Sequence, residues 1–242
     1  VGSYKGLLSV LSVVLNLVIF YIGLSLYFKG ANLLFLCVIE MIIFSIISLI
    51  LASGFNKKTL SAIISVIIST LVMLFSIVII INFTGYKGIN FNELSFLTVP
   101  IEDIILPELL IGSTGAIMDV AVAIAASLSE IVEKKSEVTF LELFKSGREI
   151  GYDIMGTMIN VLLFVFGCGL IPMCLIRMNN DVSLITIIKL HIPCELCRFL
   201  VESIGIVLAI PISILVTSVM LKVPGMFHRQ KKARKVQGEE KC

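Results

Sequence analysis

The chain has 242 residues, of which 58% are hydrophobic and 15% charged, and its mean hydropathy is +1.08. Soluble domains are about 45–50% apolar and about 25% charged, so this chain has more apolar surface than one soluble core can bury. The composition excludes a soluble globular enzyme. The net charge of +2 is too small to indicate a nucleic-acid partner, and we expect the main surroundings to be the lipid bilayer.

Six long apolar stretches, bounded by charged residues, glycine or proline, follow one another along the chain. Each holds 23 to 25 residues, and a helix of that length measures about 35–38 Å, enough to cross a hydrocarbon layer of about 30 Å. We therefore predict an all-α polytopic integral membrane protein with one transmembrane domain over residues 1–221. The six predicted spans are Gly6 to Phe28, Ala31 to Ser53, Thr59 to Phe83, Pro107 to Ile131, Tyr152 to Ile176 and Cys197 to Leu221.

The distribution of basic residues predicts the orientation. The C-terminal tail, residues 222–242, carries seven Lys and Arg residues, and the positive-inside rule places it in the cytoplasm. Six crossings then place the N-terminus in the cytoplasm as well. With this arrangement 14 of the 19 basic residues lie on the inner side, which supports the orientation.

Three connecting segments have a composition of their own. The outer segment from Thr84 to Leu106 is long enough to lie on the membrane surface. The inner segment from Val132 to Gly151 mixes apolar and charged residues, as is typical of a short interfacial amphipathic helix. The segment from Leu184 to Leu190 is apolar but too short to span, so we expect it to pack against the bundle. The alternative is that all three segments simply connect neighbouring spans.

Two carboxylates, Glu40 and Asp119, lie in the middle of predicted spans, where an ionised side chain costs roughly 2.5–3.5 kcal/mol. No Lys or Arg lies near the middle of any span, so the available partners are polar neutral groups, chiefly Thr157 and Asn160. These four residues are the predicted proton relay, or ion or substrate site. The alternative is that the carboxylates are hydrogen-bonding pegs between helices.

Small residues recur along the fourth span at a spacing that lets helices approach closely. Because Asp119 shares this spacing, we expect it to lie on a packed face that points into the bundle. The predicted packing residues are Gly112, Gly115, Ala116, Ala123 and Gly156.

The sequence HIPCELC precedes the sixth span and contains His191, Cys194 and Cys197. Three ligands without a fourth are a weak metal signal, and a redox pair or plain packing are the alternatives. No phosphate-binding glycine loop, zincin helix or nucleophile elbow is present, so we expect neither a cofactor nor an enzymatic activity.

Three sequence blocks in the C-terminal half resemble the YibE/F-like bacterial membrane proteins. They are GAIMDVAVAIAASLSEI from Gly115, SGREIGYDIMGTMINVL from Ser146 and ESIGIVLAIPISIL from Glu202. Only two residues separate the first two spans, so the chain looks like the short, YibF-like form. The resemblance implies a bacterial cytoplasmic membrane and a long-form, YibE-like partner.

A weaker similarity is to the membrane halves of the SecD/SecF and resistance-nodulation-division transporters. There too a glycine-rich helix with an Asp precedes a cytoplasmic amphipathic segment and a helix with polar Thr and Asn. The similarity implies that Asp119 is a proton relay and that the chain needs a companion, either a second copy or the long form. The sequence thus supports two functional hypotheses: a transport component, or a non-transporting assembly subunit.

Overall fold

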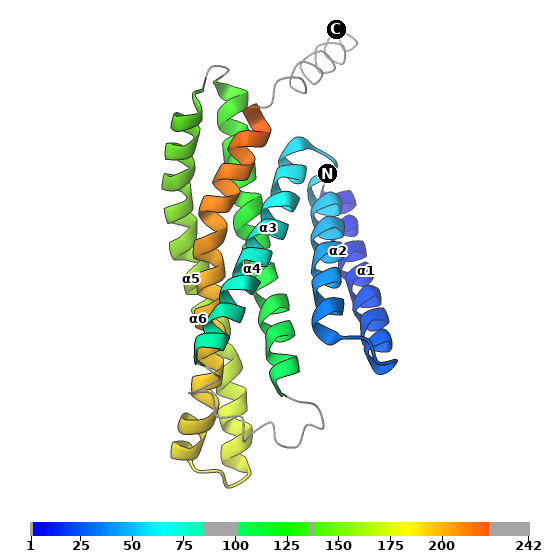
Figure 1. Ribbon diagram of the computed structural model, residues 1–242, viewed down its shortest axis with the longest axis vertical. Coiled ribbons are helices and arrows are strands. Elements are labelled where there is room, and N and C mark those ends of the chain that lie inside the picture. Colours follow the sequence, from blue (N-terminus) through cyan, green and yellow to red (C-terminus); the bar gives the residue numbers. More distant parts are fainter. Residues whose placement is uncertain (1, 85–100, 136–137, 223–242) are drawn as a thin grey trace.

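The computed structural model describes residues 2–84, 101–135 and 138–222. In this part of the chain all regular elements are α-helices, as predicted, and their order is shown in Figure 1. The helices are α1 (Gly2–Phe28), α2 (Leu33–Ser53), α3 (Lys57–Thr84), α4 (Ile101–Lys134), α5 (Phe140–Asn179) and α6 (Leu184–Lys222). Each of the six is long and apolar enough to cross a membrane. Most of the outer connection and the basic tail after Lys222 lie outside the described residues.

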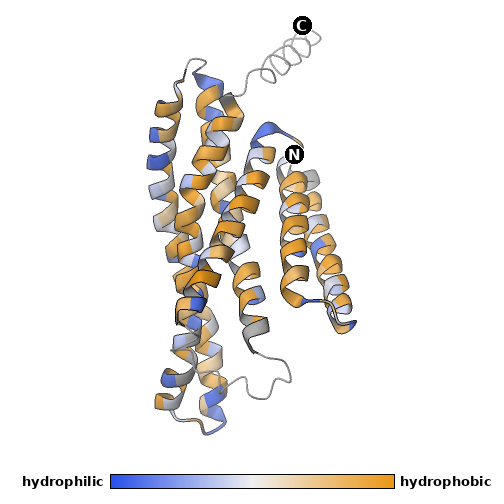
Figure 2. Ribbon diagram, viewed as in Figure 1, coloured by the Kyte–Doolittle hydropathy of each residue, from blue (hydrophilic) through white to orange (hydrophobic). Residues whose placement is uncertain are grey.

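Hydrophilic residues gather at the turns and at the ends of the helices (Figure 2), whereas the middle of each helix is mostly apolar. This pattern matches a bilayer, because polar side chains are tolerated at the interfaces and are costly in the hydrocarbon. The α1–α2 and α2–α3 turns are short. Gly54 ends α2 with a φ of 74°, a left-handed conformation that favours glycine, and its N–H donates to the Ile50 carbonyl at 2.8 Å.

The last two helices are longer than predicted. With 40 and 39 residues, α5 and α6 are about 60 Å long, roughly twice the hydrocarbon thickness. In Figure 1 their connected ends extend beyond the neighbouring end of α4. The apolar segment from Leu184 to Leu190 is the start of α6 and includes the fully buried Ile187, so it packs against other helices as expected.

The predicted amphipathic segment, residues 132–151, is helical from Phe140 onward, but it is not a separate interfacial helix. From Phe140 onward it continues without a break into α5, and Leu143 is 1% exposed within the main core. A capping box fixes its start: the Glu142 N–H donates to the Thr139 hydroxyl, and the Thr139 N–H donates to the Glu142 carboxylate at 2.9 Å. Leu143, with Val138 and Phe144 beside it, packs on the core, whereas Leu141 is 78% exposed, so only part of the apolar side packs on protein.

The core is formed mainly by α3, α4 and α6, and α5 packs along α6 and α4. Gly205 of α6 allows a close approach to α3, because the Met73 sulfur lies 2.9 Å from the position that a Cβ would occupy. The α1–α2 pair lies at one side of this core (Figure 1), and α1 packs chiefly on α2.

Candidate functional site

Asp119 lies on the side of α4 that faces away from the core. The buried side of the helix carries Ile117, Val120 and Ile124, all of them 0% exposed, whereas Asp119 is exposed. The prediction that Asp119 points into the bundle is therefore wrong for the single chain. The four-residue spacing of small residues was real, but the more apolar opposite side of α4 packs against α3 and α6.

The residues around Asp119 form a continuous stripe, which we call the outward face of α4. Its exposed members are Glu108, Gly112, Gly115, Asp119 and Ala126. Of these, Glu108 and Gly112 also contact side chains of α6. At Gly115 an added Cβ would meet no heavy atom within 4 Å, so this part of the stripe is open. Small residues on an open membrane-helix face are typical of helix–helix contacts.

The other predicted packing residues of α4 have mixed surroundings. Ala116 and Ala123 are half-buried, and Ala116 packs against the core. At Gly112 the Glu202 carboxylate of α6 lies 2.6 Å from the position that a Cβ would occupy, so this glycine makes room for a polar side chain.

A second open stripe, the outward face of α5, is formed by Asp153, Gly156, Thr157 and Asn160, all exposed. The Thr157 hydroxyl donates to the Ile154 carbonyl of its own helix at 2.9 Å, so it is satisfied locally. Within the described part of the chain the side-chain amide of Asn160 makes no hydrogen bond. Gly156 has no heavy atom within 4 Å of a built Cβ, and the most apolar window of α5 contains no buried residue.

Asp119 and the outward face of α5 lie at the same level of the bundle. Leu128 of α4 packs at Gly147 of α5, at 3.4 Å from the Cβ position. The two helices follow each other across a short connection and run antiparallel. On α4, Asp119 lies nine residues before Leu128. On α5, Gly156 lies nine residues after Gly147 and next to Thr157. The common depth that the sequence predicted is thus supported, but no hydrogen bond among the described residues joins Asp119 to α5.

Glu40 is placed elsewhere. Its side chain is 6% exposed and packs between α2 and α1, directly against Gly23, where there is no room for a Cβ. The same helix pair is linked by the Asn16 amide, which donates to the Ser48 hydroxyl at 2.9 Å. Glu40 therefore belongs to the α1–α2 contact, and the structure does not bring it together with Asp119.

An ion-pair cluster that the sequence did not single out joins α4 to α6. Arg198 contacts the carboxylates of both Glu108 and Glu195, the latter at 3.0 Å. Glu202 lies one turn further along α6, against Gly112. The Glu195 and Arg198 spacing of three residues was a readable signal, but Glu108 is ninety positions away and no local pattern connects it.

Sequence reasoning also missed the glycines that allow α5 to approach α6. Gly147 packs on the Ile214 side chain, and Gly151 packs on Ile210. Their four-residue spacing is the small-xxx-small pattern of membrane helix contacts, and that pattern was readable within the block SGREIG.

The side chains of His191 and Cys194 lie outside those that the structure describes, so the metal candidate stays a prediction. Cys197, its third member, is exposed. Among the described side chains no group of three or more His, Cys, Asp or Glu residues is arranged to hold a metal ion.

Six helices that are long and apolar enough to cross a membrane define the class: a polytopic α-helical membrane protein. The family model described as YibE/F-like protein matches residues 1–223, which is most of the chain. The chain therefore belongs to the YibE/F-like family. Comparison with curated proteins found no match, and comparison with solved structures found none either.

Proposed function

We propose that this chain is a membrane transport component in which Asp119 carries protons. The supporting observation is the position of Asp119, at mid-helix on the outward face of α4 with no hydrogen bond or ion pair to any described residue. Intramembrane carboxylates are expensive and rare, and they commonly mark ion or proton pathways.

The proposal includes a partner that covers the outward faces of α4 and α5. Asp119 and Asn160 are polar side chains at membrane depth, and contact with lipid alone would leave them unsatisfied. A second copy in the same orientation is the occupant that we propose. It presents its own Asp119 and Asn160 at matching depths, so that each copy can satisfy the other in an isologous contact. Occupation by a long-form, YibE-like protein is the alternative outcome.

The proposed setting is a bacterial cytoplasmic membrane with both termini in the cytoplasm. The family membership and the excess of basic residues on one side support it. The proposed activity is proton movement, together with the movement of any solute that is coupled to it.

The test is proton flux into vesicles that contain the purified full chain and an internal pH-sensitive dye. A potassium gradient with valinomycin supplies the driving force. We expect acidification above that of protein-free vesicles, and Asp119→Asn should reduce it to the protein-free rate, because the amide cannot release a proton. Glu40→Gln is the matched control: it also neutralises a mid-span carboxylate, but one that packs between α1 and α2.

Equal flux in the wild type and Asp119→Asn would refute the relay. The competing function, an assembly subunit without transport, is favoured if the wild type shows no flux above empty vesicles and Asp119→Asn weakens association between copies. Size-exclusion chromatography of both proteins in the same detergent shows whether the variant is folded and in which oligomeric state.

A further inference from the structure

Glu202 of α6 is a carboxylate inside the apolar span Glu195–Leu221, and it reaches the outward face of α4. Its Oε1 atom lies 2.6 Å from the position that a Cβ would occupy on Gly112. Gly112 precedes Asp119 by seven residues on the same face, which is about two helical turns. The missing side chain at Gly112 therefore makes room for a carboxylate of α6 on the stripe that carries Asp119.

The neighbouring charges leave Glu202 without a counter-ion. Arg198, one turn earlier on α6, contacts Glu108 and Glu195, so two carboxylates already share its guanidinium group. Glu202 makes no hydrogen bond or ion pair with any described residue. Three of these four side chains are acidic and one is basic, and such an excess of negative charge attracts protons to this end of the bundle.

Glu202 is half-buried, so its carboxylate can exchange a proton with water although it lies inside a span. An ionised carboxylate at such a position is costly when it has no partner. Glu40, by contrast, is 6% exposed and closed off between α1 and α2. Glu202 thus combines access to water with a position on the face of Asp119.

The part of α4 between Glu202 and Asp119 carries small residues. Seven residues of helix separate Gly112 from Asp119, a distance of about 10 Å. At Gly115, between them, an added Cβ would meet no heavy atom within 4 Å. Two or three water molecules, each about 2.8 Å from the next, would bridge this distance. The second copy proposed above would separate that space from lipid.

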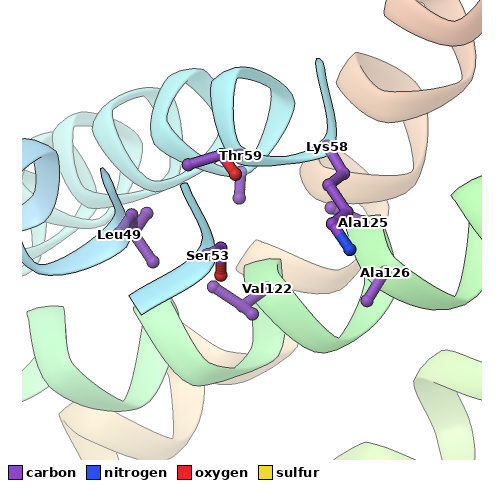
Figure 3. A pocket seen from close by; sticks show the side chains of 8 residues that line it. Leu49, Ser53, Lys58, Thr59, Val122, Ala125 and Ala126 are labelled. Atoms are coloured by element: carbon purple, nitrogen blue, oxygen red, sulfur yellow. The ribbon is translucent and has the colours of Figure 1, made fainter. Parts of the chain in front are cut away.

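The opposite end of the outward face differs. There Ala126, seven residues after Asp119, borders a small cavity at the α2–α3 turn (Figure 3), and the described residues that line it include Lys58 but no carboxylate. Glu130, further along α4, already pairs with Lys134 at 2.7 Å. The unpaired carboxylate of Glu202 therefore lies at the end of the bundle where α5 turns into α6.

We propose that Glu202 is the proton acceptor at this end of the bundle and that it delivers protons to Asp119. The inference rests on the proton relay proposed above, and in the proposed orientation this end faces the exterior. The Glu202 carboxylate takes a proton from a hydronium ion, which becomes water. The resulting acid releases this proton through water to the Asp119 carboxylate, and Glu202 returns to its ionised form.

The vesicle flux assay with the full chain tests this role. Glu202→Gln should slow proton flux about tenfold or more, because a positioned proton donor or acceptor contributes roughly 10²–10⁴ to a proton-transfer step. Glu202→Asp keeps a carboxylate and should retain more flux than Glu202→Gln. Gly112→Ala keeps every ionisable group, but its methyl group would displace the Glu202 carboxylate, so flux should fall here as well.

Glu195→Gln is the matched control, since it removes one negative charge at the same end of α6 while Arg198 keeps Glu108 as a partner. Its flux should stay close to that of the wild type. Equal slowing by Glu195→Gln and Glu202→Gln overturns the proposed role, because the lost negative charge alone would then account for the effect.

The same assay separates failure of this role from failure of the relay. If wild-type flux is lost in Asp119→Asn but unchanged in Glu202→Gln, the Glu202 role is overturned and the relay stands. If the wild type shows no flux, both are overturned. Size-exclusion chromatography shows whether each variant is folded. Gly112→Ala keeps the test decisive if Glu202→Gln fails to fold, because it displaces only the end of a flexible side chain.

Discussion

Glycines that look alike in the sequence have different surroundings in the bundle. Gly151 packs directly on the Ile210 side chain, whereas Gly156, five residues further along the same helix, has nothing within 4 Å of a built Cβ. Gly151→Ala should therefore destabilise the protein by about 1–3 kcal/mol, the usual effect of overpacking. In the monomer, at high detergent, Gly156→Ala should be neutral or stabilising by up to about 1 kcal/mol, because alanine favours a helix.

Thermal unfolding in detergent checks this pair of single-methyl changes. The expected result is a lower Tm for Gly151→Ala and an unchanged or higher Tm for Gly156→Ala. If both variants lose stability by the same amount, the difference in packing between the two glycines would be disproved.

The sequence could identify which residues are unusual in a membrane, but not which of them meet. Glu40 and Asp119 were recognisable because mid-span carboxylates are costly. Their separation into an α1–α2 contact and an open face of α4 depends on which side of each helix is buried. Those sides follow from packing between helices that are distant in sequence, such as Gly205 against Met73. Along α4 the apolar residues Ile117, Val120 and Ile124 mark the buried side, but the spacing of small residues on the other side competes with that signal.

At the scale of the helices, the outward faces of α4 and α5 carry the polar side chains of Asp119 and Asn160, which have no hydrogen-bond partner among the described residues of a single chain. Gly115→Leu should weaken association between copies, because the larger side chain projects from the face that we propose is covered. The single chain should tolerate it, since no heavy atom lies near. Gly6→Leu on α1, where a built Cβ is equally open, is the control and should leave association unchanged.

Cross-linking at increasing detergent-to-protein ratios measures this association. Equal dimer fractions for wild type, Gly115→Leu and Gly6→Leu would argue against a second copy on this face. Dimer formation that is lost only in Gly115→Leu would support it.

Helix number and order were predictable because each apolar stretch has the length of the bilayer. The predicted spans lie within four residues of the ends of α1 to α3, whereas α4 begins six residues before the predicted Pro107. The ends of α5 and α6 were not predictable in the same way. Polar and charged residues interrupt the apolar pattern at Arg148 and Arg198 without interrupting the helix, since the longer helices continue beyond the hydrocarbon and pack on each other.

For the whole molecule, the proposed orientation rests on the uneven distribution of basic residues. We expect a cysteine at position 145, Lys145→Cys, to face the cytoplasm, and Lys29→Cys, in the α1–α2 turn, to face the outside. In a variant without its native cysteines, a membrane-impermeant maleimide should label Lys29→Cys in intact cells and Lys145→Cys only after the cells are permeabilised. Both positions are exposed, so burial does not limit labelling. The reverse labelling pattern would contradict the proposed orientation and would place both termini outside the cytoplasm.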